Sequence, residues 1–243
     1  MDKALDRVEL LIGKQQTQQI MDSSIMVVGC GGVGAMAAEA LVRFGVGKII
    51  LVDHDVVAMS NLNRQIHATV TSIGEKKVDA LYKRLRSISD RCDVITIDRF
   101  IDQSNIDELF KIQIDVMIDA IDTVTSKLML IKKAQEHDIP IVSSMGMGNR
   151  MDPTQIRVLP LNKTTHDPLA KVVRYQCRKQ GLDDTIRVVC SLETPIKQTV
   201  RINDSPILKQ AMPPSSSSFV PMAAGLACGY EAISIILSLK EVL

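Results

Sequence analysis

The sequence predicts an α/β protein built on one mainly parallel sheet. Short apolar runs rich in Val and Ile alternate with segments of helical periodicity between residues 25 and 144. Such runs are typical of strands that are buried on both faces. A glycine-rich turn, "VGCGGVG" at 28–34, joins the first run to the first helical segment. Because crossovers between parallel strands are right-handed, the pattern predicts a Rossmann-like, doubly wound fold with a C-terminal strand and helix extension.

In the first half of the chain, the local sequence pattern predicts each element of this fold. Residues 2–21 predict one amphipathic helix, because four apolar side chains recur at helical spacing, namely Leu5, Val8, Leu11 and Ile12. Strands are expected at 25–29, 48–53, 93–98, 115–120 and 140–144. Helices are expected at 33–44, 75–88, 104–110 and 123–136.

The alternation stops after residue 144, which predicts an appended region. Strands are expected at 154–161 and 186–191, a helix at 165–180, and a long irregular stretch rich in Pro and Ser at 195–218. The apolar C-terminal segment contains Pro221 and Glu231, so it predicts a buried or interfacial helix rather than a membrane span. The expected division is an N-terminal helical segment (1–24), a nucleotide-binding domain (25–150) and an extension for substrate binding and dimerisation (151–243).

Composition limits the protein class. The chain has 243 residues, 46% of them hydrophobic, which is enough for a sizeable core. Its formal net charge of +1 excludes a strongly basic nucleic-acid coat protein. The five cysteines form no C-x-x-C pair and no secretory leader precedes them, which favours a cytoplasmic location and argues against a structural zinc site.

The glycine-rich turn indicates a phosphate-binding loop. Gly29, Gly31, Gly32 and Gly34 lie between a predicted strand and a predicted helix, the context in which a helix N-terminus binds phosphate. Asp53 ends the next strand, where an acidic residue binds a nucleotide ribose. These features alone favour NAD, and a glycine turn without a ligand is the structural alternative.

Residues beyond Asp53 favour a triphosphate. Asn61 and Arg64 follow that strand closely, and Lys76 and Lys77 begin the next helix. Cations at these places suit attack on an α-phosphorus, because they stabilise the charge of departing pyrophosphate. Individually, such side chains are usually solvated surface charges.

Two carboxylates follow the fourth strand of the predicted sheet. Asp119 and Asp122 stand in "IDAID" at the sheet edge where ligands bind. One of them can hold Mg²⁺ against phosphates, and either can instead cap the next helix.

These residues, in their order along the chain, resemble those of the ThiF/MoeB superfamily. Its members are relatives of ubiquitin-activating enzymes and adenylate carboxylates with ATP. The resemblance implies that Asp53 binds ribose, Asn61 and Arg64 contact phosphates, Lys77 stabilises the leaving charge and Asp122 holds Mg²⁺. It assigns this role to Lys77 rather than Lys76 by spacing. It also implies a homodimer in which an N-terminal arginine, here Arg7, reaches the partner subunit's site.

The second half, "GMGNRMDPTQIRVLPLNKTTHDPLAKVVR", resembles the tRNA threonylcarbamoyladenosine dehydratases (TcdA or CsdL). The resemblance implies adenylation of the threonylcarbamoyl carboxylate in tRNA, followed by dehydrative ring closure. Activation of a ubiquitin-like sulfur carrier is the alternative, although its usual zinc-binding cysteine pairs are absent. An NAD-dependent oxidoreductase and a non-catalytic nucleotide-binding or RNA-binding module also stay open. A sulfur-relay partner and a monovalent cation near residues 145–153 also stay open.

Basic charge is concentrated in the second half. Residues 151–212 carry ten Lys or Arg against six Asp or Glu. On the predicted helix, Lys171, Arg174 and Arg178 share one face, which suits an RNA backbone, and an ordinary solvated face is the alternative. The opposite, apolar face is expected to contain Leu169, Val172, Val173 and Cys177.

Cys190 lies near a position where some dehydratases carry a proposed nucleophile. Its offset differs by about two positions, so it is interpreted as a buried strand residue, the commoner state of a free cysteine.

Overall fold

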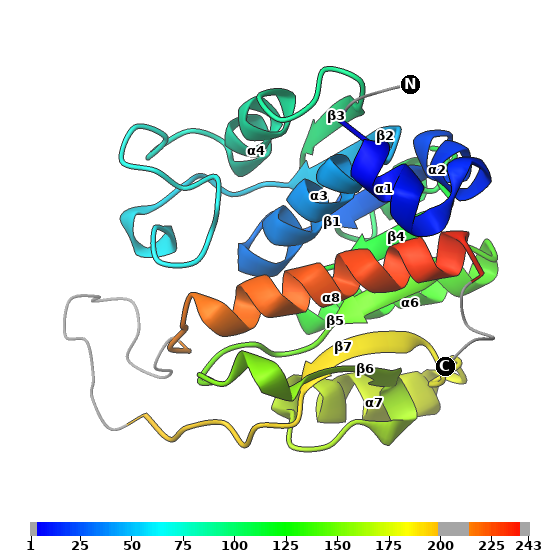
Figure 1. Cartoon of the computed structure of the whole chain (residues 1–243). Coiled ribbons are helices and arrows are strands. Elements are labelled where there is room, and N and C mark those ends of the chain that lie inside the picture. Colours follow the sequence, from blue (N-terminus) through cyan, green and yellow to red (C-terminus); the bar gives the residue numbers. More distant parts are fainter. Residues whose placement is uncertain (1–3, 199–213, 239–243) are drawn as a thin grey trace.

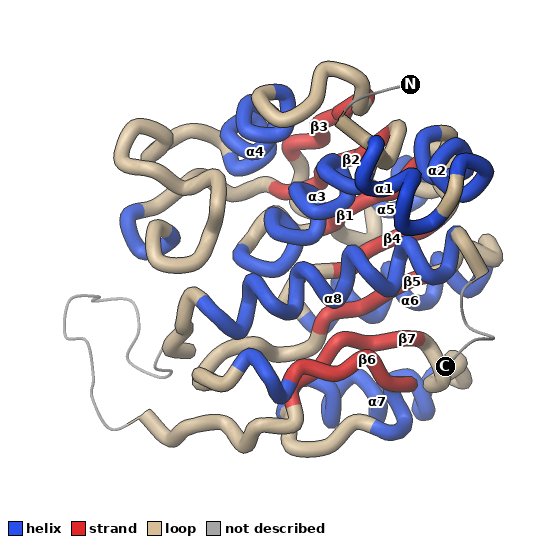
Figure 2. Tube along the Cα trace, viewed as in Figure 1, coloured by secondary structure: helices blue, strands red, loops and turns tan. Residues whose placement is uncertain are grey.

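The computed structural model describes residues 4–198 and 214–238. They form a sheet between two helical layers (Figures 1 and 2). The strands are β1 (Ser24–Val28), β2 (Lys48–Asp53), β3 (Asp93–Asp98), β4 (Val116–Asp119), β5 (Ile141–Ser144), β6 (Ile156–Pro160) and β7 (Arg187–Ser191). The α-helices are α1 (Asp6–Ile12), α2 (Lys14–Met21), α3 (Gly32–Phe44), α4 (Lys77–Arg86), α5 (Ile106–Leu109), α6 (Val124–Glu136), α7 (Pro168–Gln180) and α8 (Phe219–Ile236). Short 3₁₀ turns occur at η1 (Met59–Asn61), η2 (Pro153–Gln155) and η3 (Leu161–Lys163).

The sheet confirms the doubly wound prediction. Its strand order is β3-β2-β1-β4-β5-β7-β6, and only β6 runs antiparallel, at one edge. The chain proceeds from β1 to β2 on one side and later returns to β4 on the other. This switch point between β1 and β4 is where open α/β sheets bind ligands. Strands β6 and β7 belong to the same sheet, so this part of the predicted extension is continuous with the predicted nucleotide-binding domain.

Alternation along the central strands supplies two separate cores. Ile25 and Val27 of β1 join a cluster with α3, α4 and α8, whereas Met26 and Val28 join a cluster with α5, α6 and α7. Successive strand side chains point to opposite faces, so apolar runs are needed where helices cover both faces.

The C-terminal helix packs along α3 (Figure 1). Among the described helices, α8 alone is long and apolar enough to cross a membrane, yet 56% of its apolar stretch is buried inside the protein. Its packing agrees with the expected buried helix.

Several predicted boundaries need correction. The prediction of a single N-terminal helix is wrong, because Gly13, with φ 85° and ψ 161°, separates α1 from α2. Leu11 is 76% exposed rather than packed. The helix expected from residue 75 starts at Lys77, since residues 74 and 75 instead hydrogen-bond with Val57.

The helix expected from residue 165 begins at Pro168. The Asp167 side chain caps it by accepting from Ala170 N at 2.9 Å, and proline suits the first helical position. The expected helix 104–110 is a single turn. Of the irregular stretch predicted at 195–218, residues 199–213 lie outside the described residues.

Candidate nucleotide-binding site

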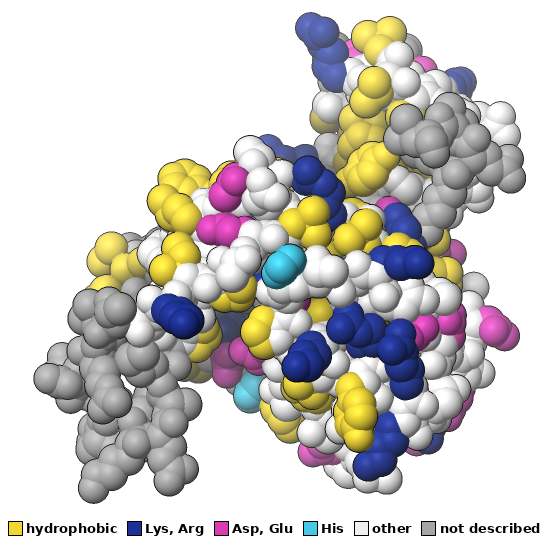
Figure 3. Space-filling view, turned by 90° about the horizontal axis from the view of Figure 1, so that it is seen from below, with side chains coloured by type: hydrophobic (Ala, Val, Ile, Leu, Met, Phe, Trp, Pro, Cys, Tyr) yellow, Lys and Arg dark blue, Asp and Glu magenta, His cyan; other side chains and the backbone are white. Residues whose placement is uncertain are grey.

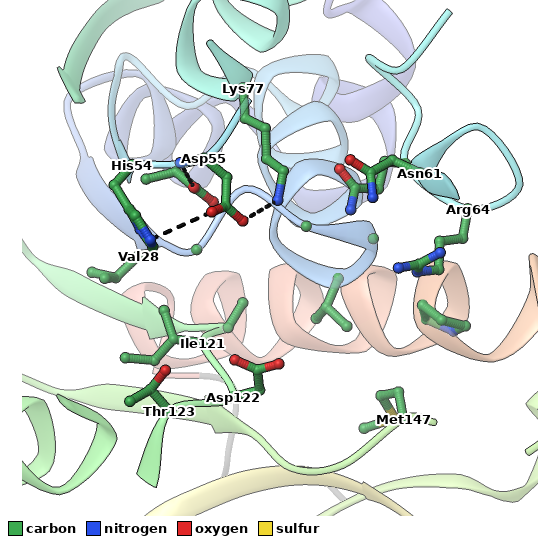
Figure 4. Close-up of a pocket in the computed structure, with 18 of the residues that line it drawn as sticks. Val28, His54, Asp55, Asn61, Arg64, Lys77, Ile121, Asp122, Thr123 and Met147 are labelled. Carbon is green, nitrogen blue, oxygen red and sulfur yellow. Dashed lines mark hydrogen bonds and ion pairs between the residues drawn. The ribbon is translucent and has the colours of Figure 1, made fainter. Parts of the chain in front are cut away.

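A cleft of about 400 Å³ lies at the carboxyl ends of the central strands (Figure 4). Its walls come from several separate parts of the chain: the glycine loop, the ends of β2, β3 and β4, η1, the start of α4, and residues 147–148 with 214–216. The cleft therefore sits at the switch point predicted by the strand order.

The glycine loop brings the N-terminus of α3 to this cleft. Gly31 caps the helix and Gly32 is its first residue. A Cβ at Gly34 would lie only 1.8 Å from the carbonyl oxygen of Gly29, so the loop and helix can pack this closely only with glycine there. The exposed N–H groups and helix dipole at this end favour an anionic ligand.

Asp53 lines the cleft and also fixes the loop. Its Oδ2 accepts a hydrogen bond from Cys30 N at 2.6 Å, and its Oδ1 accepts from Asp55 N at 2.8 Å. This holds the carboxylate beside the glycine loop, in the position expected of a ribose-binding acid. That role stays a prediction.

The adjacent lysines at the start of α4 separate in space. Lys77 is 7% exposed and lines the cleft, with its Nζ 2.6 Å from Asp55 Oδ2. Lys76 points elsewhere and pairs with Asp98, whose hydrogen bond raises the pKa of the lysine. Of the two, the structure brings only Lys77 to the cleft.

Asn61 and Arg64 occupy the wall opposite the end of β4 (Figure 4). Asn61 is buried, and its Oδ1 accepts from Ala58 N at 2.9 Å. The Arg64 guanidinium donates to Ser60 O and Asn63 Oδ1, both at 2.8 Å. Both side chains are therefore held in place by neighbouring backbone and amide groups.

The two carboxylates after β4 have different surroundings. Asp119 is fully buried, and its Oδ2 lies 2.6 Å from Lys127 Nζ and accepts from Ser143 Oγ at 2.6 Å. Asp122 is exposed and lines the cleft. Thr123 is the N-cap position of α6, so neither aspartate occupies it. Of these two, Asp122 is the carboxylate that lines the cleft, and a carboxylate oxygen is the kind of ligand that Mg²⁺ takes.

All five cysteines are buried and none forms a disulfide. Burial, followed by the Asp53 charge, raises the pKa of Cys30 well above its usual value. Cys190 lies in β7, where burial and then Asp167 raise its pKa to about 11. The strand interpretation of Cys190 is confirmed, and its neutral thiol is poorly suited to nucleophilic attack.

The segment at 145–153 holds a buried cation of its own. Arg150 is 3% exposed, and its Nη2 lies 3.4 Å from Asp167 Oδ2. Its guanidinium also donates to three backbone carbonyls, those of Gly146, His166 and Glu193. Burial raises the pKa of the Asp167 carboxyl in spite of this neighbour.

The basic face of α7 is more mixed than predicted (Figure 3). Lys171 and Arg178 are exposed, although Arg178 pairs with Asp184 at 2.7 Å. Arg174 is half-buried and donates to Thr164. Val172 is 43% exposed, which corrects its expected apolar position, whereas Val173 and Cys177 are buried. Arg7 is exposed on α1 and does not line the cleft.

His67 lies buried behind the cleft and makes stability depend on pH. Neither ring nitrogen has a hydrogen-bond partner among the described residues. Burial, then the Lys77 charge, lowers the pKa of His67 from 6.5 to about 4; Asp53 opposes this shift and Arg84 adds to it. Between these values the unfolded chain binds a proton that the folded protein does not. Stability attributable to His67 therefore falls as the pH drops from 6.5 to about 4.

We expect His67→Gln to reduce this acid sensitivity. Urea unfolding at pH 7.5, 6 and 5 should show a smaller loss of unfolding free energy in the variant than in the unmodified protein. Identical pH dependences would contradict the assignment to His67.

Sequence reasoning missed several parts of the cleft, among them residues 99–101 after β3. Another is Asp55, which pairs with Lys77. Its position two residues after Asp53, at the end of a strand, could have indicated that it lies at the cleft. Residues 147–148 and 214–216 are joined only by the fold, so no local motif could identify them.

Comparisons with known proteins agree with this fold. The ThiF family model matches residues 5–242. The tRNA threonylcarbamoyladenosine dehydratase of Bacillus subtilis (strain 168) is 41% identical over 242 residues, covering 97% of this chain and 95% of that protein. A crystal structure of the E. coli tRNA N6-threonylcarbamoyladenosine dehydratase in complex with ATP has a TM-score of 0.88 and 31% identity, covering 98% of this chain and 95% of the other. Because the family model spans nearly the whole sequence, this chain belongs to the ThiF family.

Proposed function

We propose that this protein uses ATP to adenylate the carboxylate of threonylcarbamoyladenosine in tRNA and then closes it into a ring with net loss of water. The observation that carries this proposal is the meeting of the α3 N-terminus, Arg64, Lys77 and Asp122 in one cleft. The similarity to dehydratases from Bacillus subtilis and E. coli supports the choice of substrate.

Adenylation gives the carboxylate a better leaving group, which is AMP. A carboxylate oxygen attacks the α-phosphorus of ATP, and the bond to pyrophosphate breaks. A nucleophile on the same modified nucleoside then attacks the activated carbonyl carbon, and AMP departs with the former carboxylate oxygen. Because both groups belong to one nucleoside, proximity assists the ring closure.

The cleft residues have distinct roles in this scheme. Asp53 binds the ribose, and Asn61 and Arg64 contact phosphates. Lys77 leaves its ion pair with Asp55 and stabilises the negative charge of the leaving pyrophosphate. Asp122 would hold Mg²⁺, which supplies charge neutralisation at the phosphates when bound. This scheme requires no cysteine as an acyl carrier, in keeping with the burial of Cys190.

The remaining roles complete the proposal. Residues 25–150 bind ATP, and residues 151–243 supply substrate and dimer contacts. The protein acts in the cytoplasm as a homodimer in which Arg7 reaches the partner subunit's site, and Lys171, Arg174 and Arg178 lie near the tRNA backbone. A monovalent cation near Arg150 and a sulfur-relay partner stay predictions.

The decisive experiment measures the nucleoside itself. The protein is incubated with ATP, Mg²⁺ and tRNA bearing threonylcarbamoyladenosine, and the tRNA is digested to nucleosides for mass spectrometry. We expect a product lighter by one water, together with AMP. An unchanged nucleoside mass would contradict the proposal, while stabilisation by NAD but not by ATP in thermal unfolding would favour an oxidoreductase.

A further inference from the structure

Residues 214–218, here called the strap, contribute Pro214, Ser215 and Ser216 to the far wall of the cleft. Asn149 holds one end: its Oδ1 accepts from Ser215 N at 2.8 Å and from Ser215 Oγ at 2.9 Å. Asn149 N also donates to Ser215 O at 2.7 Å. Three hydrogen bonds thus join the turn after β5 to a segment 66 residues further along the chain.

Asn63 holds the other end of the strap. Its Nδ2 donates to Ser216 O at 3.0 Å, and its backbone oxygen accepts from Ser218 Oγ. The same Asn63 side chain accepts from Arg64 through Oδ1. The strap therefore runs from the turn after β5 to the loop that carries a predicted phosphate ligand.

Backbone conformation makes Asn149 hard to replace. Its φ of 60° lies in the left-handed region, which asparagine tolerates better than most residues with a side chain. The preceding residue, Gly148, is constrained by space, because a Cβ there would lie 2.7 Å from Pro214 Cβ. The turn and the strap are therefore packed directly against each other.

This wall differs chemically from the rest of the cleft. Met147, Gly148 and three strap residues line it, and none of them carries a charged side chain. Figure 4 shows Met147 across the cleft from Lys77 and Arg64. In phosphoryl transfer, the attacking and leaving oxygens lie roughly in line on opposite sides of phosphorus. If pyrophosphate leaves toward the cations, the carboxylate arrives from the uncharged side.

We propose that the strap and the Met147–Gly148 turn form the binding surface for the threonylcarbamoyl group, and that Asn149 is the positioning residue that sets it. This inference rests on the proposed function, because it takes the cations as the pyrophosphate side. Asn149 acts through Ser215 and touches no reacting atom. Its loss should weaken productive binding of the modified tRNA while leaving ATP binding intact.

The test compares two substitutions at one position. Asn149→Gly keeps the left-handed backbone accessible but removes the acceptor, whereas Asn149→Asp keeps an acceptor for Ser215. We expect N149G to raise the concentration of modified tRNA needed for half-maximal AMP formation about tenfold. The dissociation constant of ATP, measured by calorimetry without tRNA, should change less than about twofold. N149D should restore most of the tRNA dependence.

Two further variants separate positioning from general damage. Asp138 has a comparable φ of 54° and lies between α6 and β5, away from the cleft, so Asp138→Gly is a matched control that should change neither constant. Ser215→Ala removes one of the three hydrogen bonds and should cause a smaller loss of the same kind. It decides the question if N149G does not fold.

The outcomes distinguish this inference from the proposed function. Unchanged tRNA dependence in both N149G and S215A, with an active unmodified protein, would overturn the inference alone. Equal weakening of ATP and tRNA binding would also overturn it, because that result indicates general damage. If the unmodified protein forms no AMP from ATP and modified tRNA, the proposed function fails and this inference fails with it.

Discussion

Lys127→Met is expected to destabilise the folded protein by about 3–5 kcal/mol, because it leaves a buried carboxylate without its partner. Lys127 and Asp119 both have fully buried side chains. The ammonium uses its three hydrogens on Asp119 Oδ2 at 2.6 Å, Ser143 Oγ at 3.1 Å and Ser144 O at 3.0 Å. Methionine fills similar space but supplies none of these contacts.

Urea unfolding of K127M, Asp119→Asn and the double variant D119N/K127M measures this effect. The double variant should recover much of the lost stability, since it contains no unpaired buried charge. Glu39→Gln provides a comparison, because Glu39 is also buried but has two arginine partners nearer the surface. A K127M protein within about 1 kcal/mol of the unmodified one would show that the pair is dispensable.

Arg64→Ala is expected to slow AMP formation by about 10²- to 10³-fold without unfolding the protein, the usual effect of removing one electrostatic transition-state contact. Arg64 is half-buried, and within the described part of the chain its side chain donates only to Ser60 and Asn63, so its loss leaves no buried charge unpaired. Single-turnover measurement of AMP with saturating ATP isolates the chemical step from binding.

A matched arginine controls for the loss of positive charge. Arg43 is 57% exposed at the far end of α3 and pairs with Glu39, so Arg43→Ala should keep the rate of AMP formation. Thermal unfolding of R64A and R43A should show folded proteins in both cases. An R64A rate close to that of R43A would remove Arg64 from the proposed mechanism.

Much of the sheet could be predicted because its strands are apolar on both faces. The run 48–53 gave β2 with its observed ends, and 93–98 gave β3. Boundaries controlled by single backbone conformations were harder, as Gly13 shows by dividing the N-terminal helix. Periodicity describes which side chains share a face, but it does not reveal where one glycine leaves the helical region.

Site residues were predictable where they follow strands directly. The glycine loop and Asp53 line the cleft because parallel strands end at one edge of the sheet. The partner of Asp119 was not predictable in the same way, since Lys127 reaches it only after the chain has turned into α6. The Asn149–Ser215 contact joins distant segments, and sequence alone contains no distance between them.

The position of α8 against α3 has a consequence for how this protein is made. The glycine loop and α3 leave the ribosome before the strap and α8, and contacts between segments so far apart in the sequence form slowly. A nascent or prematurely ended chain can therefore present phosphate-binding groups before it has the wall assigned to the acyl substrate. Because the strap follows the glycine loop in the sequence, the proposed adenylation site is incomplete until the strap has been synthesised.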